Sequence, residues 1–119
     1  MPTIREILLV PHTHHDIGYT NTPRACLEGH ERGIYDVLDL CESDPDDHAP
    51  DAFRWTFEIS RPVVQFLRHA SPSDVERLRA LAERKRIALT AGYLHMTQLI
   101  GHEDYVRFFL PVSIVQHAG

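Results

Sequence analysis

Three histidines and an aspartate crowd into residues 12–16, which read His-Thr-His-His-Asp directly after a run of four apolar residues. That run is typical of a buried strand, so the polar residues occupy the loop where the strand ends. Side chains two apart share a face of extended backbone, so we expect His12, His14 and Asp16 to point together and His15 to point away. Two imidazoles and a carboxylate with an open position suit zinc and other divalent cations.

Further polar residues follow other predicted strands. Glu58 ends the second strand, His95 follows the third and His117 follows the fourth. Because the carboxyl ends of parallel strands meet at one edge, these residues are expected near the histidine cluster. Glu58 could serve as an acid or base, as a partner that orients a histidine, or as a structural carboxylate. Tyr19 could offer an aromatic platform to a ligand or simply pack against its neighbours.

The elements that must position these residues follow from hydrophobic pattern and from helix start signals. Strands are predicted at 4–11, 53–58, 87–91 and 111–116, and helices at 22–42, from 60, at 71–86 and at 102–109. Thr22-Pro23 and Ser71-Pro72 both read as an N-cap followed by proline in the first turn, a typical helix start. The cations at 84–86 suit a helix C-terminus.

The order of these elements, β-α-β-α-α-β-α-β, predicts the α/β class with a parallel sheet and right-handed crossovers. Four such strands make a small open sheet or about half of a closed (βα)₈ barrel. The chain of 119 residues is long enough for one domain, and we expect residues 1–119 to form one.

Composition indicates which classes of binding partner to expect and in which cellular compartment the protein resides. The formal net charge of −5 argues against nucleic acid, which requires a basic face. The sequence has no apolar run of about 18 residues, so no membrane partner is expected. The N-terminal residues lack the pattern of a signal peptide. Cys26 and Cys41 lie 15 residues apart on one predicted helix, too far for a disulfide, which favours reduced thiols and a cytoplasmic location.

Three stretches together resemble the N-terminal region of glycoside hydrolase family 38, the retaining α-mannosidases. Residues 11–19, Pro-His-Thr-His-His-Asp-Ile-Gly-Tyr, resemble the family's metal motif, Pro-His-(Ser/Thr)-His-Asn-Asp-Pro-Gly-Trp. Residues 53–60, Phe-Arg-Trp-Thr-Phe-Glu-Ile-Ser, are similar to an aromatic run that ends in Ser-Glu-Ile-Ser. Residues 86–93, Arg-Ile-Ala-Leu-Thr-Ala-Gly-Tyr, resemble a third stretch, Leu-Glu-Ile-Val-Gly-Gly-Trp. The resemblance covers residues 4 to about 109 in order.

The resemblance implies a seven-stranded (β/α) barrel domain that binds one zinc ion. By position, His14 and Asp16 match the first two zinc ligands, and His12 matches a histidine that is not a ligand. Tyr19 stands where the family's tryptophan underlies the sugar ring. The resemblance therefore implies a zinc-dependent retaining glycoside hydrolase that acts on α-mannoside-like carbohydrate, with Glu58 and His95 as supporting or substrate-binding candidates at the same edge.

In the family, an aspartate after the fourth strand is both zinc ligand and nucleophile. The chain ends where that aspartate is due, and the connection after Phe109 is short. The resemblance thus implies a domain truncated at its C-terminal end, with no catalytic residue assigned and no turnover by the chain alone. Ile17, Tyr19 and Tyr93 replace the family's proline and tryptophans, which is more similar to a divergent bacterial branch than to the eukaryotic enzymes.

Two other readings stay open on the residues alone. A metal-dependent phosphoesterase or sugar deacetylase also places His-x-His at a strand end and draws further histidines from later strands, for which His95 and His117 are available. A non-catalytic α/β fragment without metal is the second. The exposed edge of a parallel sheet favours self-association, so a homo-oligomer is expected in either case.

Overall fold

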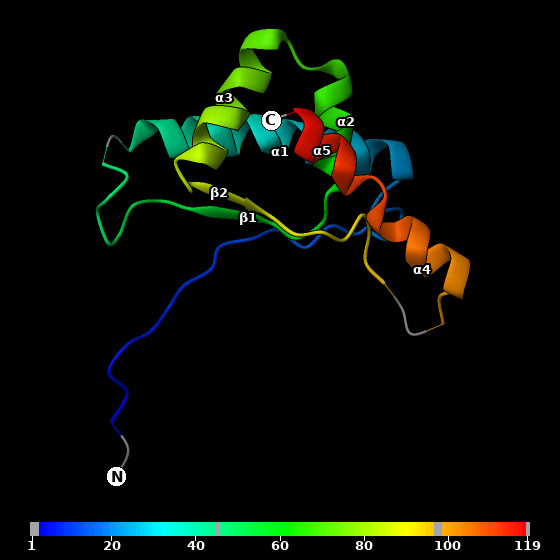
Figure 1. Cartoon of the computed structure of the whole chain (residues 1–119), viewed down its shortest axis with the longest axis horizontal. Helices are drawn as coiled ribbons and strands as arrows, with labels where there is room; N and C mark the ends of the chain where they lie inside the picture. The colour runs from blue at the N-terminus through cyan, green and yellow to red at the C-terminus, as the bar shows by residue number, and fades with distance from the viewer. Residues whose placement is uncertain (1–2, 45, 97–98, 119) are drawn as a thin grey trace.

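The computed structural model describes residues 3–44, 46–96 and 99–118, apart from the side chains of Gln116 and Ala118. The elements in chain order are α1 (Pro23–Ser43), β1 (Trp55–Phe57), α2 (Arg61–His69), α3 (Pro72–Glu83), β2 (Ile87–Leu89), α4 (His102–Phe109) and α5 (Val112–Ala118). The fold mixes helices with a small sheet (Figure 1), consistent with the predicted α/β class.

The sheet consists of β1 and β2, which run parallel in the register Trp55 to Ile87 and Phe57 to Leu89. Helices α2 and α3 form the crossover between the strands, and α1, α2 and α3 lie on one side of the sheet (Figure 1). Both strands fall inside predicted ones. The described residues hold only these two strands, so the seven-stranded barrel stays a prediction.

An apolar core joins α1, α2 and α3 to the sheet. Helix α1 contributes the stripe predicted from its sequence, and α2 adds Phe66, which is 0% exposed. The core residues of α1 at i, i+3, i+4 and i+7 are Ile34, Val37, Leu38 and Cys41. Cys26 and Cys41 are both buried and free, as the spacing along one helix predicts.

Two of the predicted helix starts have their caps in place. The Thr22 side chain accepts a hydrogen bond from the Ala25 backbone N–H at 3.3 Å, and Ser71 Oγ accepts one from Asp74 N–H at 3.2 Å. These bonds satisfy amide groups that a helix leaves unpaired in its first turn. Ser60 precedes α2 without a side-chain cap bond.

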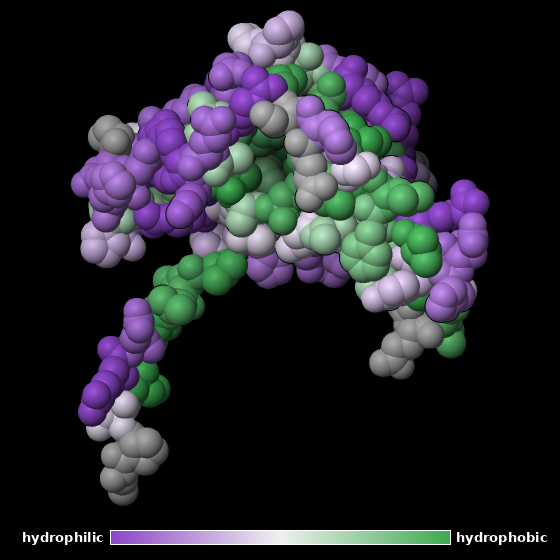
Figure 2. Space-filling model, viewed as in Figure 1, coloured by the Kyte–Doolittle hydropathy of each residue, from purple (hydrophilic) through white to green (hydrophobic). Residues whose placement is uncertain are grey.

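The first predicted strand, 4–11, is wrong for the described part of the chain. Residues 3–11 have no strand structure, and the only pairing here is a parallel bridge between His12 and Thr56, whose N–H donates to Pro11 O at 3.0 Å. The apolar side chains of residues 7–10 are 65–86% exposed, and the segment projects away from the body (Figure 2). The reason is that, among the described residues, this segment pairs with β1 only at Thr56, so the apolar run has no strand beside it there.

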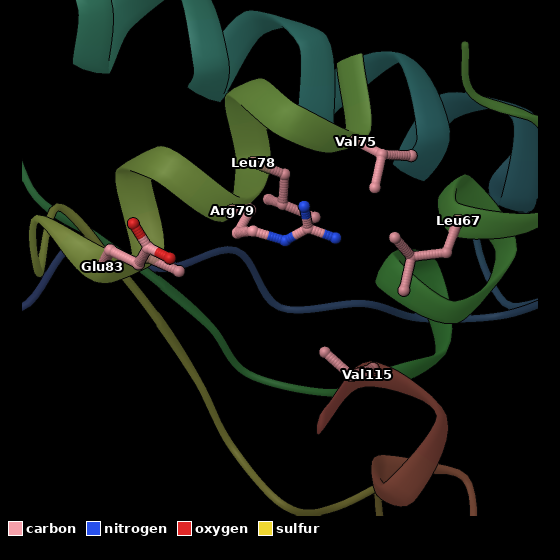
Figure 3. A pocket seen from close by; sticks show the side chains of 7 residues that line it. Leu67, Val75, Leu78, Arg79, Glu83 and Val115 are labelled. Atoms are coloured by element: carbon pink, nitrogen blue, oxygen red, sulfur yellow. The ribbon is translucent and has the colours of Figure 1, made fainter. Parts of the chain in front are cut away.

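The fourth predicted strand, 111–116, is also wrong, because these residues belong to α5 (Val112–Ala118) and to the turn before it. The β-branched residues favour a strand, but a helix allows Val115 to pack against the core. Helix α5 faces α2 and α3 across an apolar groove of about 200 Å³ (Figure 3). The side chains labelled around it are Leu67, Val75, Leu78, Arg79, Glu83 and Val115.

Arg86, which directly precedes β2, anchors the loop that joins α1 to β1. Its side chain is 0% exposed and donates to Phe53 O at 2.7 Å and to Asp44 O at 3.0 Å. It also pairs with the carboxylate of Asp47, which Arg84 contacts from the surface. The buried guanidinium therefore fixes where β1 begins.

Within the described ranges, no helix combines the length and the apolar composition that a membrane span requires.

Candidate metal centre

Three segments bring polar side chains to the carboxyl end of the two-stranded sheet. His14 follows the Pro11–His12 stretch that pairs with β1 at Thr56. Glu58 comes directly after β1, and His95 follows β2 by six residues. The loop after β2 is tied to the end of β1, because Ser60 N–H donates to Gly92 O at 2.7 Å. Parallel pairing thus places the ends of β1 and β2 at one edge, as expected.

At this edge the carboxylate of Glu58 lies among three imidazoles. His14 Nδ1 lies 3.3 Å from Glu58 Oε2 and 3.5 Å from Oε1. His95 Nε2 lies 3.5 Å from Oε2, and His12 Nδ1 lies 3.9 Å from it. The rings of His14 and His95 lie side by side, with their centroids 4.5 Å apart and their planes tilted by 31°.

Asp16 meets the opposite edge of the His14 ring, with Oδ1 3.2 Å from Nε2. The structure therefore brings His12, His14 and Asp16 to one place, while His15 turns away into the protein and is 5% exposed. This is the alternation predicted for extended backbone. Gly18, at φ +84°, provides the turn that leads from this loop to α1, in a backbone conformation that favours glycine.

The donor set fits a divalent cation. One nitrogen each from His14 and His95 and a carboxylate oxygen of Glu58 all lie within 4.8 Å of one another. Glu58 Oε2 is buried and makes no hydrogen bond of acceptable geometry within the described part of the chain. A buried carboxylate oxygen is costly without compensation, and a cation held between it and neutral imidazoles would supply that compensation.

Other predicted candidates lie outside this cluster. Tyr19 is 92% exposed, so its ring is open to a ligand but is not packed beside the imidazoles. His117 lies in α5, where its Nδ1 is 2.6 Å from Ser113 O. It therefore does not join the cluster, contrary to its predicted place after a strand.

The structure also pairs two histidines that the sequence patterns did not connect. His15 and His30 meet edge to face with ring centroids 4.3 Å apart, beside a cavity of about 80 Å³ that Trp55 also lines. Their Nδ1 atoms are buried without a hydrogen-bond partner in the ranges described. The sequence signal was there, because Gly29 and Gly33 flank His30 on α1 and line the same cavity.

Burial, together with the neighbouring His30, lowers the pKa of His15 to about 4. In the unfolded chain a histidine has a pKa near 6.5. As pH falls from about 7 to 4, the unfolded state takes up a proton that the folded state does not. The free energy of unfolding should therefore fall in this window, by an amount on the order of 3 kcal/mol from His15.

The test is urea unfolding with a chelator present at pH 7.5 and 4.5, for the wild type and His15→Asn. The variant cannot titrate at this position, so its loss between the two pH values should be smaller by roughly 2–3 kcal/mol. Equal losses in the two proteins would show that His15 is not held neutral by burial.

Comparison with known proteins identifies one family. The model of the family described as "Glycosyl hydrolases family 38 N-terminal domain" matches residues 5–109. This range contains the cluster and both strands. No curated protein and no solved structure matches the chain.

Proposed function

The chain belongs to glycosyl hydrolase family 38, and we propose that it forms the N-terminal part of the catalytic domain of a retaining, zinc-dependent glycosidase that acts on α-mannoside-like carbohydrate. The observation that carries this proposal is the cluster at the end of the sheet. There, His14 lies between the carboxylates of Asp16 and Glu58, with the ring of His95 beside its own.

The family pattern gives His14 and Asp16 the role of metal ligands, and their contact of 3.2 Å supports that pairing. A bound zinc ion would act as a Lewis acid and as a template that orients the sugar hydroxyls. Glu58 supports the site from the other edge of the His14 ring. The Nδ1–H group of His14 can donate to Glu58 Oε1 at 3.5 Å, which would fix the ring's orientation and leave Nε2 facing Asp16.

The remaining side chains supply contacts for a sugar. Tyr19 is 92% exposed, and an exposed aromatic face suits stacking against the apolar face of a pyranose ring. His12 and His95, both beside Glu58, offer hydrogen bonds to hydroxyl groups. Retaining hydrolysis needs one carboxylate as nucleophile and another as acid and then base. No residue of this chain is assigned the nucleophile's role, so sugar binding, and not turnover, is the property by which the proposal is tested.

A second candidate function draws on one specific contact. A metal-dependent phosphoesterase or sugar deacetylase would gather an additional histidine from a later strand, and His95 lies beside His14 in this way. His117, the other histidine available to that reading, does not join the cluster. The family match over residues 5–109 favours the glycosidase.

The proposal is tested by measuring sugar binding with saturation-transfer NMR. With zinc present, methyl α-mannoside should bind, and a chelator should abolish the signal. His14→Ala should lose at least about tenfold in affinity, because even an outer partner of a metal ligand is worth roughly 10- to 100-fold. Methyl β-galactoside is the control for specificity, and His48→Ala, an exposed histidine in the loop after α1, is the control for the substitution.

Mannoside binding that ignores both chelator and His14→Ala would contradict the proposal. Release of phosphate from an aryl phosphate, or of acetate from an N-acetylated sugar, without mannoside binding would favour the second candidate. Closure into a seven-stranded barrel, a cytoplasmic location and self-association remain predictions. The exposed apolar residues 7–10 are consistent with self-association.

A further inference from the structure

A cavity of about 80 Å³ lies between α1, β1 and the loop that carries His15. Three of the side chains that line it have a buried nitrogen that the described residues leave without a hydrogen-bond partner: His15 Nδ1, His30 Nδ1 and Trp55 Nε1. Buried polar atoms in proteins are nearly always paired, either with protein groups or with ordered water. His15 is only 5% exposed, so bulk solvent does not supply its partner. The three nitrogens therefore have hydrogen-bonding capacity for a bound molecule.

Two glycines of α1, Gly29 and Gly33, line the same cavity one helical turn apart. Glycine inside a helix is unfavourable relative to alanine, and close packing does not require it at either position. Outside the backbone of α1 itself, a Cβ atom at Gly33 would meet no described atom within 4 Å, and one at Gly29 would meet Arg32 Nη2 at 3.9 Å. Both glycines are partly exposed, so the absence of side chains here leaves space between solvent and the cavity.

The lining of the cavity restricts the chemistry of a ligand. No acid, lysine or arginine is among the described residues that line it, so an ion would be buried without a counter-charge, which is costly. The rings of His15 and His30 touch edge to face, and within the described ranges they do not belong to a group of three metal-binding side chains. A small uncharged ligand fits this lining better than an ion does.

The hydrogen-bonding groups favour a hydroxyl. The indole Nε1–H of Trp55 can only donate, whereas a neutral imidazole either donates or accepts at Nδ1, depending on its tautomer. One hydroxyl group donates once and accepts twice, so it can pair with all three nitrogens at the same time. The volume of about 80 Å³ exceeds what one water molecule needs, and it suits a short alcohol as well.

We propose that this cavity is a binding site for small uncharged molecules that carry a hydroxyl group, held by His15, His30 and Trp55 and reached between Gly29 and Gly33. Ordered water and short alcohols share this chemistry. Because His30 belongs to α1 and His15 to the loop before it, the bound molecule links these two segments. The inference is independent of the proposed function, since it requires neither a metal ion nor a sugar at the cluster around the Glu58 carboxylate.

The test is NMR of the full chain at pH 7.5. Trp55 is the only tryptophan in the sequence, so its indole N–H gives a single signal. In buffer alone, that signal should show cross-relaxation with a slowly exchanging water molecule. Addition of 2-propanol should shift the signal until it saturates. Acetone has the same number of non-hydrogen atoms but cannot donate, so it should bind at least about tenfold more weakly.

Two variants test the residues that form the site. His30→Phe keeps an aromatic ring but removes one of the three partners, so it should weaken 2-propanol binding at least about tenfold and reduce the contact with water. Gly33→Leu places a side chain in the opening and should abolish the 2-propanol shift. His48→Phe and Asp36→Leu, both at exposed positions, are the matched controls and should behave as the wild type does. Unfolding curves verify that each variant keeps its fold.

The outcomes separate the two possible occupants. A water contact together with a saturable 2-propanol shift supports a site that exchanges water for alcohol, whereas a water contact without any shift supports ordered water as the occupant. The inference is overturned if the indole N–H of Trp55 shows neither signal, if 2-propanol and acetone bind equally, or if His30→Phe changes nothing. A 2-propanol shift that persists in Gly33→Leu would overturn the opening assigned to the glycines. None of these results depends on zinc or on mannoside binding, so each leaves the proposed function to its own test.

Discussion

Replacing Arg86 by methionine should lower the free energy of unfolding by about 3–5 kcal/mol, the usual cost of breaking a buried ion pair by removing one partner. The guanidinium is 0% exposed. Its loss leaves the carbonyls of Phe53 and Asp44 without their donor and removes a buried partner of Asp47. Chemical denaturation of the wild type and the variant at pH 7 measures the difference.

Arg84→Met is the matched control, because Arg84 contacts the same carboxylate of Asp47 from the surface, where its side chain is 41% exposed. Exposed ion pairs contribute little to stability, so this variant should unfold close to the wild type. Equal destabilisation by the two substitutions would show that the position of Arg86 inside the fold is not what matters.

Leu38→Ala should cost about 2–5 kcal/mol, the range for removing a buried leucine side chain and leaving a cavity. Leu38 is 0% exposed in the core between α1 and the sheet. Leu40 lies two residues further along the same helix and is 50% exposed. Leu40→Ala makes the same change in composition and should alter stability by less than about 0.5 kcal/mol.

The stabilities of Leu38→Ala and Leu40→Ala are compared through their denaturant midpoints, with the same dependence of the unfolding free energy on denaturant concentration for both. If both alanine variants lose similar stability, α1 does not turn Leu38 toward the core and Leu40 toward solvent as the structure shows. The contrast bears on the site as well, because α1 carries His30 against His15, next to the loop that holds His14.

The helix starts and the positions of β1 and β2 could be predicted from sequence, because they depend on local signals. Thr22 and Ser71 cap α1 and α3 as expected, and β1 and β2 fall within the predicted ranges. Residues 4–11 could not be placed in the same way. An apolar run indicates a segment that should be buried, but which strand it pairs with depends on segments far away in the sequence. Among the described residues, this segment meets β1 only at Thr56.

The residues after α4 show a different limit. The run at 111–116 combines β-branched side chains with a length that suits either a strand or a short helix. Its own sequence does not decide between them, whereas packing of Val115 against the core of α2 and α3 does. The burial of Arg86 was likewise hidden, because its sequence context favoured a cation at the C-terminus of a helix over 71–86, whereas α3 ends at Glu83 and Arg86 directly precedes β2.

The gathering of these side chains was largely predictable, because parallel strands end at one edge of the sheet, whereas their role as a site stays a prediction. That rule brought Glu58 and His95 to the histidine loop, and alternation separated His14 from His15. What the rule could not give was which edge of the His14 ring faces which carboxylate. The three-dimensional arrangement is needed to place Nε2 toward Asp16 and Nδ1 toward Glu58.

The most direct measurement of the central claim is the metal content of the purified chain, determined by elemental analysis for the wild type and His14→Ala. His14 is the residue at the centre of the proposed site, since it contacts Asp16 through one ring nitrogen and Glu58 through the other. The account predicts about one zinc per wild-type chain and almost none in His14→Ala. Equal and near-zero metal in both proteins would contradict it and leave a non-catalytic α/β fragment as the remaining interpretation.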